Sequence, residues 1–328
     1  MHMHSKRIGI IAASAVVALS LAGCGRGAAA PTAGGSTGGT TPYVAIVSKG
    51  FSQQFWQAVK KGAESEATKE GARITFEGPP TESDTEKQIT MLTNVLAKKP
   101  DAIGFAALDS KAAAPLMDQA KSAKIPVIAF DSGVESTVPV TTAATDNKAA
   151  AAEAAKHLSG LLGGKGVVGM VIHDQTSQTG IDRRVGFVDW MKANAPGITL
   201  LAPQYSNSDL AKAADITKAM IAANVNLAGI YGSNEASAEG VAKGITESGK
   251  KGLKAVGFDS GKAQIDAINS GVLSGSVTQN PVGIGEQVVA AAMKAIKGTA
   301  QPKFIDTGFF WYDKTNITDP KITAVLYQ

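Results

Sequence analysis

The chain has 328 residues, of which 44% are hydrophobic and 18% are charged, against a usual charged share of about 25%. A chain this apolar is not disordered, and its length suggests about two domains or one large one. The formal net charge of +4 is too small, and the basic residues too scattered, for a nucleic-acid-binding surface. The single cysteine excludes intramolecular disulfides, thiolate zinc sites and iron–sulfur clusters.

The first elements are a leader and a tether. Lys6 and Arg7 precede an uncharged stretch of 15 residues, 8–22, which suits a signal peptide, because a membrane span needs about 20 residues. The stretch runs into Leu21-Ala22-Gly23-Cys24, which resembles the bacterial lipobox, whose cysteine is acylated and becomes the new N-terminus. The alternative is an ordinary secretory leader with an incidental cysteine. We therefore predict a lipoprotein signal peptide over 1–23, lipidation of Cys24, and a flexible Gly/Thr-rich tether over 24–42.

From residue 43 onwards, short apolar runs alternate with helical patterns. The runs predict strands at 43–47, 73–76, 102–106, 126–130, 141–144, 167–172, 198–202, 227–231, 253–258 and 275–278. Helical patterns between most of them include 55–69, 85–97, 112–123, 147–162, 210–223 and 284–297. Apolar strands separated by amphipathic helices indicate parallel sheets covered on both faces. Ten strands are too many for one comfortable sheet, so an α/β fold with two doubly wound, Rossmann-like lobes is predicted.

An internal repeat also indicates two similar lobes. The tetrapeptide Phe-Asp-Ser-Gly occurs at 130–133 and again at 258–261, each time directly after a buried strand. The carboxyl ends of strands in open α/β sheets are where ligands bind. Two similar lobes that each present an acidic loop at this edge would form a cleft between them.

No catalytic or cofactor motif survives inspection. The chain has no phosphate-binding Gly-x-x-x-x-Gly-Lys-Ser/Thr, no dinucleotide fingerprint, no Gly-x-Ser-x-Gly nucleophile elbow and no Asp-x-Asp-x-Asp-Gly loop. His173 and Asp174 follow a predicted strand; for His173, strand-end capping, lining of a cleft and catalysis all remain open. We expect no enzyme, no metal and no cofactor.

Several segments in a fixed order resemble the sugar-binding lipoproteins of bacterial ABC importers, of the ribose/galactose-binding type of periplasmic binding protein. In the first half these are Gln54-Phe55-Trp56, the run 126–131, and Thr145-Asp146-Asn147. In the second half they are Arg183-x-x-Gly186-Phe187, the run 232–235, the run 256–259 and Val277-Thr278-Gln279. The resemblance covers essentially residue 43 to the C-terminus.

The resemblance implies a set of ligand-binding residues around an interlobe cleft. Gln53 would contribute a polar group, while Phe55 and Trp56 would stack on a sugar ring, whose faces are mostly C–H. Asp131 and Asp259 would accept hydroxyl hydrogen bonds. The predicted set is Gln53, Phe55, Trp56, Asp131, Ser132, Arg183, Asn234, Asp259 and Gln279. Ribose-binding relatives commonly carry Arg where this chain has Ser132, so their ligand does not transfer to it.

The resemblance also implies lobe boundaries and partners. The N-terminal lobe would comprise 43–145 plus 279–308 and the C-terminal lobe 146–278 plus 309–328, joined by a three-segment hinge. We expect a monomer outside the cytoplasm, anchored to the cell membrane through Cys24. It would close on a small neutral sugar or polyol and deliver it to an ABC permease with its ATPase. The alternatives are a sugar receptor that signals through a membrane sensor and a lipid-anchored hydrolase.

Overall fold

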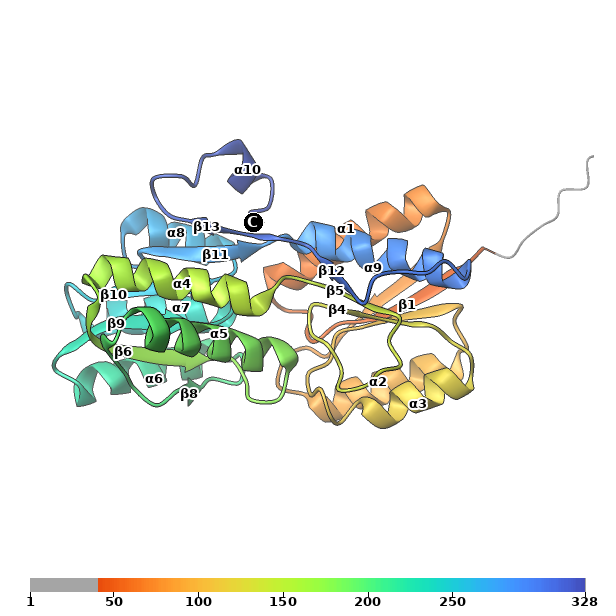
Figure 1. Cartoon of the computed structure of the whole chain (residues 1–328), viewed down its shortest axis with the longest axis horizontal. Helices are drawn as coiled ribbons and strands as arrows, with labels where there is room; N and C mark the ends of the chain where they lie inside the picture. Colours follow the sequence, from red (N-terminus) through yellow and green to blue (C-terminus); the bar gives the residue numbers. More distant parts are fainter. Residues whose placement is uncertain (1–40, 328) are drawn as a thin grey trace, which may run out of the picture. The chain divides into compact units, whose positions relative to one another are not determined.

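A computed structural model describes residues 41–327, which form two α/β lobes (Figure 1). The predicted leader and Cys24 lie outside the described residues. All ten predicted strands are present, and the predicted architecture of two parallel-sheet lobes is confirmed. Strands that the sequence did not predict are β8, β12 and β13. Among the described residues, no helix is long and apolar enough to cross a bilayer.

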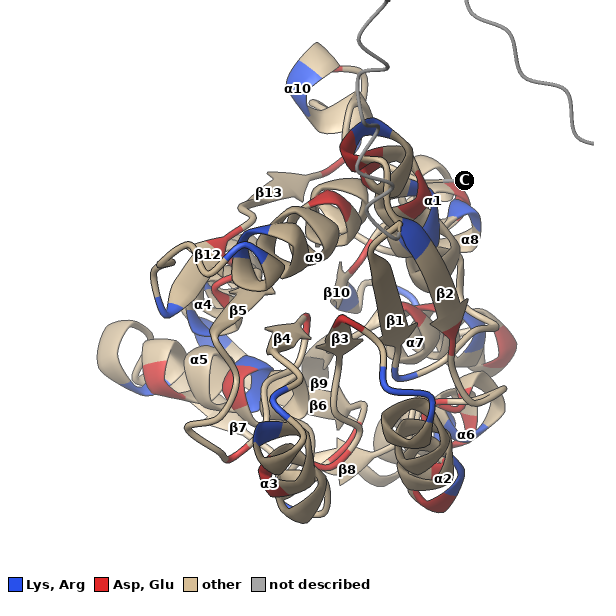
Figure 2. Cartoon of the chain, turned by 90° about the vertical axis from the view of Figure 1, so that its right-hand side faces the viewer, with Lys and Arg blue, Asp and Glu red and all other residues tan. Residues whose placement is uncertain are grey.

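The first lobe is built on a six-stranded, fully parallel sheet with the order β12-β5-β4-β3-β1-β2. Two helices pack on each face of this sheet, α1 and α9 on one side and α2 and α3 on the other (Figure 2). The elements are β1 (Tyr43–Val47), α1 (Gln54–Glu70), β2 (Arg73–Glu77), α2 (Thr85–Ala97), β3 (Ala102–Phe105), α3 (Ala114–Ser122), β4 (Val127–Phe130), β5 (Thr141–Ala144), α9 (Pro281–Ile296) and β12 (Phe304–Asp306).

The second lobe has the sheet order β13-β11-β10-β9-β6-β7, with β8 paired to β6, and only β13 runs antiparallel. Helices α4 and α5 cover one face, and α6, α7 and α8 cover the other. The elements are α4 (Asn147–Leu162), β6 (Lys165–Ile172), α5 (Gln178–Asn194), β7 (Gly197–Leu200), β8 (Gln204–Tyr205), α6 (Leu210–Ala223), β9 (Leu227–Gly232), α7 (Glu235–Ser248), β10 (Lys254–Phe258), α8 (Lys262–Ser270), β11 (Gly275–Gln279), β13 (Phe309–Tyr312) and α10 (Pro320–Thr323).

The chain passes between the two sheets three times: from β5 to α4, from β11 to α9, and from β12 to β13. The first lobe therefore receives α9 and β12 from the C-terminal part of the chain, after β11. The C-terminal segment also touches both lobes: the Tyr327 ring packs edge-on against Phe55, and its hydroxyl accepts a hydrogen bond from the Ser260 N–H.

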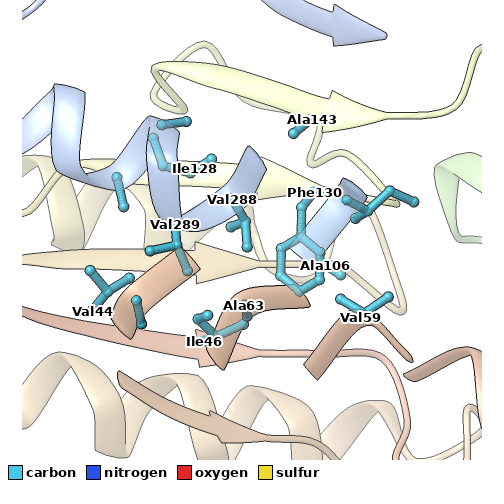
Figure 3. Packing of buried hydrophobic residues seen from close by; sticks show 14 of the residues in the cluster. Val44, Ile46, Val59, Ala63, Ala106, Ile128, Phe130, Ala143, Val288 and Val289 are labelled. Atoms are coloured by element: carbon cyan, nitrogen blue, oxygen red, sulfur yellow. The ribbon is translucent and has the colours of Figure 1, made fainter. Parts of the chain in front are cut away.

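Strand β1 shows how the core of the first lobe is divided between the two faces of its sheet. Val44 and Ile46 belong to the cluster with α1 and α9, whereas Tyr43, Ala45 and Val47 belong to the cluster with α2 and α3. Figure 3 shows the first of these clusters, with Val44 and Ile46 near side chains of both helices. Burial on both faces explains why this strand reads as an unbroken apolar run and not as an alternating one.

Helices α1 and α9 approach each other closely through two glycines. A β-carbon on Gly62 would collide with the backbone carbonyl of Val282, and one on Gly285 would collide with that of Val59. The backbones leave no room for a side chain larger than hydrogen at either position. Glycine therefore sets how closely α1 and α9 pack.

The repeated Phe-Asp-Ser-Gly segments form matching turns at the ends of β4 and β10. Asp131 and Asp259 have φ values of 54° and 80°, in the left-handed region that residues other than glycine rarely adopt. Their N–H groups donate to carbonyls of the next strand, Ala143 for Asp131 and Val277 for Asp259. Each turn places its aspartate at the carboxyl end of its sheet.

Candidate ligand-binding site

A small cavity lies where the carboxyl ends of the two sheets face each other. Both lobes contribute to its lining. The residues are Lys49, Gln53, Phe55, Trp56, Glu82 and Asp131 from the first lobe, and His173, Arg183, Asn234, Asp259 and Gln279 from the second. Every predicted ligand-binding residue except Ser132 is among them.

The first-lobe side of the cavity centres on a buried ion pair. Lys49, two residues after β1, places its Nζ 3.4 Å from the Oδ2 of Asp131 and donates to the Thr179 hydroxyl of the second lobe at 2.8 Å. Burial raises the pKa of Asp131, and the Lys49 ammonium offsets only part of this. Burial lowers the pKa of Lys49, but the Asp131 and Glu82 carboxylates outweigh it and hold this pKa above its usual value. Lys49 is therefore a charged donor that spans the cleft.

The second-lobe side carries a matching pair of opposite charges. Arg183 Nη1 lies 3.6 Å from the Oδ2 of Asp259, and its guanidinium stacks on the Phe258 ring at 3.7 Å. Arg183 Nε donates to Asn147 Oδ1 at 2.8 Å, which fixes the plane of the guanidinium. Asp259 Oδ1 accepts from Gln279 Nε2 at 2.7 Å. Burial raises the pKa of Asp259, and Arg183 and Gln279 act in the opposite direction.

Two adjacent aromatic residues at the start of α1 form an apolar wall. The Phe55 and Trp56 rings meet edge to face, with centroids 4.9 Å apart and an interplanar angle of 84°. Both rings line the cavity and both also belong to the core cluster beneath it. The Trp56 indole N–H donates to Glu82 Oε1 at 2.7 Å, so this ring cannot rotate without losing a buried hydrogen bond.

Glu82 closes the cavity at the rim between the lobes. In addition to Trp56, its carboxylate accepts from Ser208 Oγ at 2.7 Å and from Asn234 Nδ2 at 3.2 Å, both in the second lobe. Burial would raise the pKa of Glu82, but the Lys49 charge and these hydrogen bonds outweigh it and leave the pKa below its usual value. Asn234 also caps α7, since its Oδ1 accepts from the Ser237 N–H.

His173 lines the cavity as a neutral side chain. Its Nδ1 lies 2.8 Å from Ser233 Oγ and its Nε2 lies 3.2 Å from Thr179 Oγ1. Burial, with the charges of Lys49 and Arg183, holds the pKa of His173 well below its usual range. Asp174 caps the following loop by accepting from the N–H and hydroxyl of Ser177. Of the roles left open for His173, the geometry therefore favours lining of the cleft.

Ser132 is the one predicted ligand-binding residue that is not among those lining the cavity. Asp131 has a left-handed φ, and the Ser132 N–H donates to the Phe130 carbonyl. The Ser132 carbonyl accepts from the Ala107 N–H, just after β3, and the residue is fully buried. A role for Ser132 in ligand binding stays a prediction.

The cavity presents acceptors that the described residues do not satisfy. Asp131 Oδ2 and Gln279 Oε1 are buried and have no hydrogen-bond partner among residues 41–327. Buried polar atoms are nearly always hydrogen-bonded, so these two are available to a ligand with O–H groups. Each of the two cations already faces a carboxylate, which leaves no surplus positive charge for an anionic ligand. Among the described residues, no group of three or more His, Cys, Asp or Glu is placed to hold a metal ion.

The sequence-based set missed Lys49, Glu82 and, as an assigned ligand residue, His173. Lys49 lies two residues after a buried strand, which is the signal that could have found it. Glu82 lies in the loop after β2, where serines, threonine and prolines give no motif. Its position in the cavity depends on packing between the lobes, which no local pattern records.

Comparison with known proteins places this chain among binding proteins. Residues 44–300 match the model of the family described as "Periplasmic binding protein domain". The chain is 29% identical over 255 residues to the D-allose-binding periplasmic protein of Escherichia coli, covering 74% of this chain and 80% of that protein.

Solved structures show the same likeness. An ABC transporter solute-binding protein from Agrobacterium vitis with bound D-fucose is 36% identical, with a TM-score of 0.84, over 87% of this chain and 100% of that one. A second one from the same organism, bound with alpha-D-tagatopyranose, is 32% identical with a TM-score of 0.84, over 88% of this chain and 100% of that one. None of these three relatives is named as an enzyme.

Proposed function

This chain belongs to the periplasmic binding protein family, and from that premise we propose that it captures a small neutral sugar or polyol between its lobes. The observation that carries this is the pair of unsatisfied acceptors, Asp131 Oδ2 and Gln279 Oε1, beside cations that are already paired. The hydroxyl groups of a sugar or polyol are donors that such acceptors can take up. The relatives with bound D-fucose and tagatopyranose support a monosaccharide as the ligand.

The roles proposed for the side chains follow from their chemistry. Asp131, Asp259 and Gln279 accept or exchange hydrogen bonds with hydroxyls, and Lys49 and Arg183 donate to hydroxyl or ring oxygens. Phe55 and Trp56 contact the C–H face of the ring. The remaining polar contacts would come from Gln53, Glu82, His173 and Asn234, which also line the cavity. Charge-assisted bonds to a neutral polyol are directional, so this set favours one stereochemistry of hydroxyls over others.

We further propose that the chain works as a monomer that is anchored by a lipid on Cys24 and delivers its ligand to an ABC permease. Membership in this family supports an extracytoplasmic location, and the lipobox-like segment supports the anchor. Bending at the three connections between lobes would open and close the cleft, with lobe boundaries near residues 145, 279 and 308. Sheet membership of the flanking strands supports these boundaries.

A thermal-shift screen tests the ligand class. The chain from residue 25 onward is mixed with monosaccharides, polyols, amino acids and nucleosides in turn. A ligand at about 100 times its dissociation constant adds about 2.7 kcal/mol to the free energy of unfolding, which raises the melting temperature measurably. A shift confined to one or two sugars or polyols is expected. A shift with an amino acid or nucleoside, and with no carbohydrate, would contradict the proposal.

The anchor is tested separately, in cells that express the full chain. We expect the wild type to fractionate with membranes and to incorporate labelled fatty acid, and Cys24→Ala to lose both properties. If Cys24→Ala remained labelled and membrane-bound, the anchor would have to be elsewhere.

A further inference from the structure

Helix α1 begins without a cap from its own lobe. Its N-cap residue, Gln53, makes no side-chain capping hydrogen bond, and its first turn contains no acidic residue. The first N–H groups of a helix have no partner within the helix, and they carry partial positive charge. This helix end also carries the aromatic wall of the cavity, Phe55 and Trp56, so its position affects any ligand contact.

The missing cap comes from the other lobe. Glu235, the first residue of α7, accepts from the Gln54 N–H through Oε1 at 2.9 Å and from the Phe55 N–H through Oε2 at 3.0 Å. Glu235 is only 5% exposed, although it lies outside the cavity lining. Its own N–H donates to Asp259 Oδ2 at 2.9 Å, which ties it to a proposed ligand residue of the second lobe.

A second cap crosses the cleft in the opposite direction. Helix α8 begins after Gly261, which has no side chain to cap it. The Gln54 side chain supplies an acceptor instead, because its Oε1 accepts from the Lys262 N–H at 2.7 Å. Each lobe therefore caps a helix of the other, and these three bonds exist only while the lobes are together.

On the basis of the proposed function, we infer that Glu235 is a positioning residue for ligand binding, which holds the aromatic end of α1 against the second lobe in the closed form. Because it contacts α1 and not the cavity, Glu235 acts through Phe55 and Trp56. Its bonds form after the lobes meet, so they slow ligand release without changing the encounter of ligand with the open form. The same reasoning gives Gln54 the reciprocal role at α8.

The test is stopped-flow binding, followed by tryptophan fluorescence, with the sugar found in the thermal-shift screen. Glu235→Ala removes both acceptors and Glu235→Gln keeps one. We expect the release rate to rise about tenfold for Ala and by less for Gln, with an association rate within about twofold of wild type. Glu239→Gln is the matched control, one turn further along α7, and should bind as wild type.

Gly261→Ala provides a variant that leaves Glu235 in place. A β-carbon there would lie 3.2 Å from Gln54 Oε1 across the cleft and 3.2 Å from Glu235 Cδ in its own lobe, so it crowds the contact with Gln54 in the closed form. We expect a faster release rate for this variant too. An unchanged release rate in Glu235→Ala, or an equal change in Glu239→Gln, would overturn the inference.

Exchange of the backbone amides of residues 54 and 55, followed by NMR, separates this inference from the proposed function. Glu235→Ala should speed exchange of these two amides and leave those in the middle of α1 unchanged. If no sugar bound the wild type, the proposed function would fail, while this measurement would still decide whether Glu235 caps α1. Equal exchange in wild type and Glu235→Ala would overturn the inference whatever the ligand.

Discussion

Replacement of Asp131 tests the acceptor that carries the proposed function. Its Oδ2 has no hydrogen-bond partner among the described residues and lies 3.4 Å from Lys49 Nζ. A hydrogen bond to a charged group contributes about 1.5–3 kcal/mol net and one between neutral groups about 0.5–1.5 kcal/mol. Asp131→Asn keeps the shape and an acceptor but loses the charge, which costs the difference, about 1–1.5 kcal/mol, or about 5- to 13-fold in affinity.

The loss of sugar affinity should be larger when the Asp131 acceptor is removed altogether. Asp131→Ala forfeits the charged bond, about 1.5–3 kcal/mol, or roughly 10- to 150-fold in affinity. Titration calorimetry with the sugar found in the screen measures both, and Asp118→Asn, on the exposed side of α3, is the matched control. The expected order of affinity is wild type, then Asn, then Ala. Wild-type affinity in both Asp131 variants would refute the assignment of Oδ2 as a ligand acceptor.

Three further predictions follow from other contacts. Lys49→Met should weaken sugar binding by roughly 10- to 150-fold in calorimetry, because it removes a charged donor from the cavity. Gly62→Ala should lower the free energy of unfolding by about 1–3 kcal/mol or more in urea titration, since α9 cannot yield to a β-carbon. Gly160→Ala, exposed in α4 with open space around it, should instead raise that free energy slightly. Burial raises the pKa of Glu235 to about 8 and that of Glu239 to about 7, above their unfolded values, so the folded chain binds more protons in this window. The free energy of unfolding should therefore fall as pH rises from about 4.5 to about 8, with a smaller slope in Glu239→Gln.

Much of the fold could be predicted because buried parallel strands leave an unbroken apolar run in the sequence. Strands β1 and β4 are such runs, β10 is one after its first residue, Lys254, and the aspartates that follow β4 and β10 were also predicted. Strands β12 and β13 were not predicted. Both lie at sheet edges and are partly exposed, although β13 is a run of four aromatic residues, Phe309–Tyr312. The resemblance to periplasmic sugar-binding proteins, and with it the prediction of a binding protein and not an enzyme, is confirmed by the family match and the named relatives.

The site was less predictable where it depends on conformation or on contacts between lobes. Ser132 follows Asp131 directly, yet only Asp131 is among the residues that line the cavity; Asp131 has a left-handed φ, which sequence alone does not give. Glu82 enters the cavity only because Trp56, Ser208 and Asn234 hold it there, across distances of 26 to 152 positions in the chain. Neither effect has a local sequence signature.

Helix α9 lies near the C-terminal end of the chain, and this position affects how the first lobe folds during synthesis. Helix α1 packs against α9, more than two hundred positions away, and β12 completes the same lobe from still further along. A chain that emerges N-terminus first cannot bury the apolar face of α1 until nearly all of it is available. We therefore expect a chain cut after β11 to expose this face, to aggregate or be degraded, and to yield no isolated first lobe. If the predicted signal peptide directs export of this chain, a first lobe that cannot finish folding early would leave the chain unfolded when export begins.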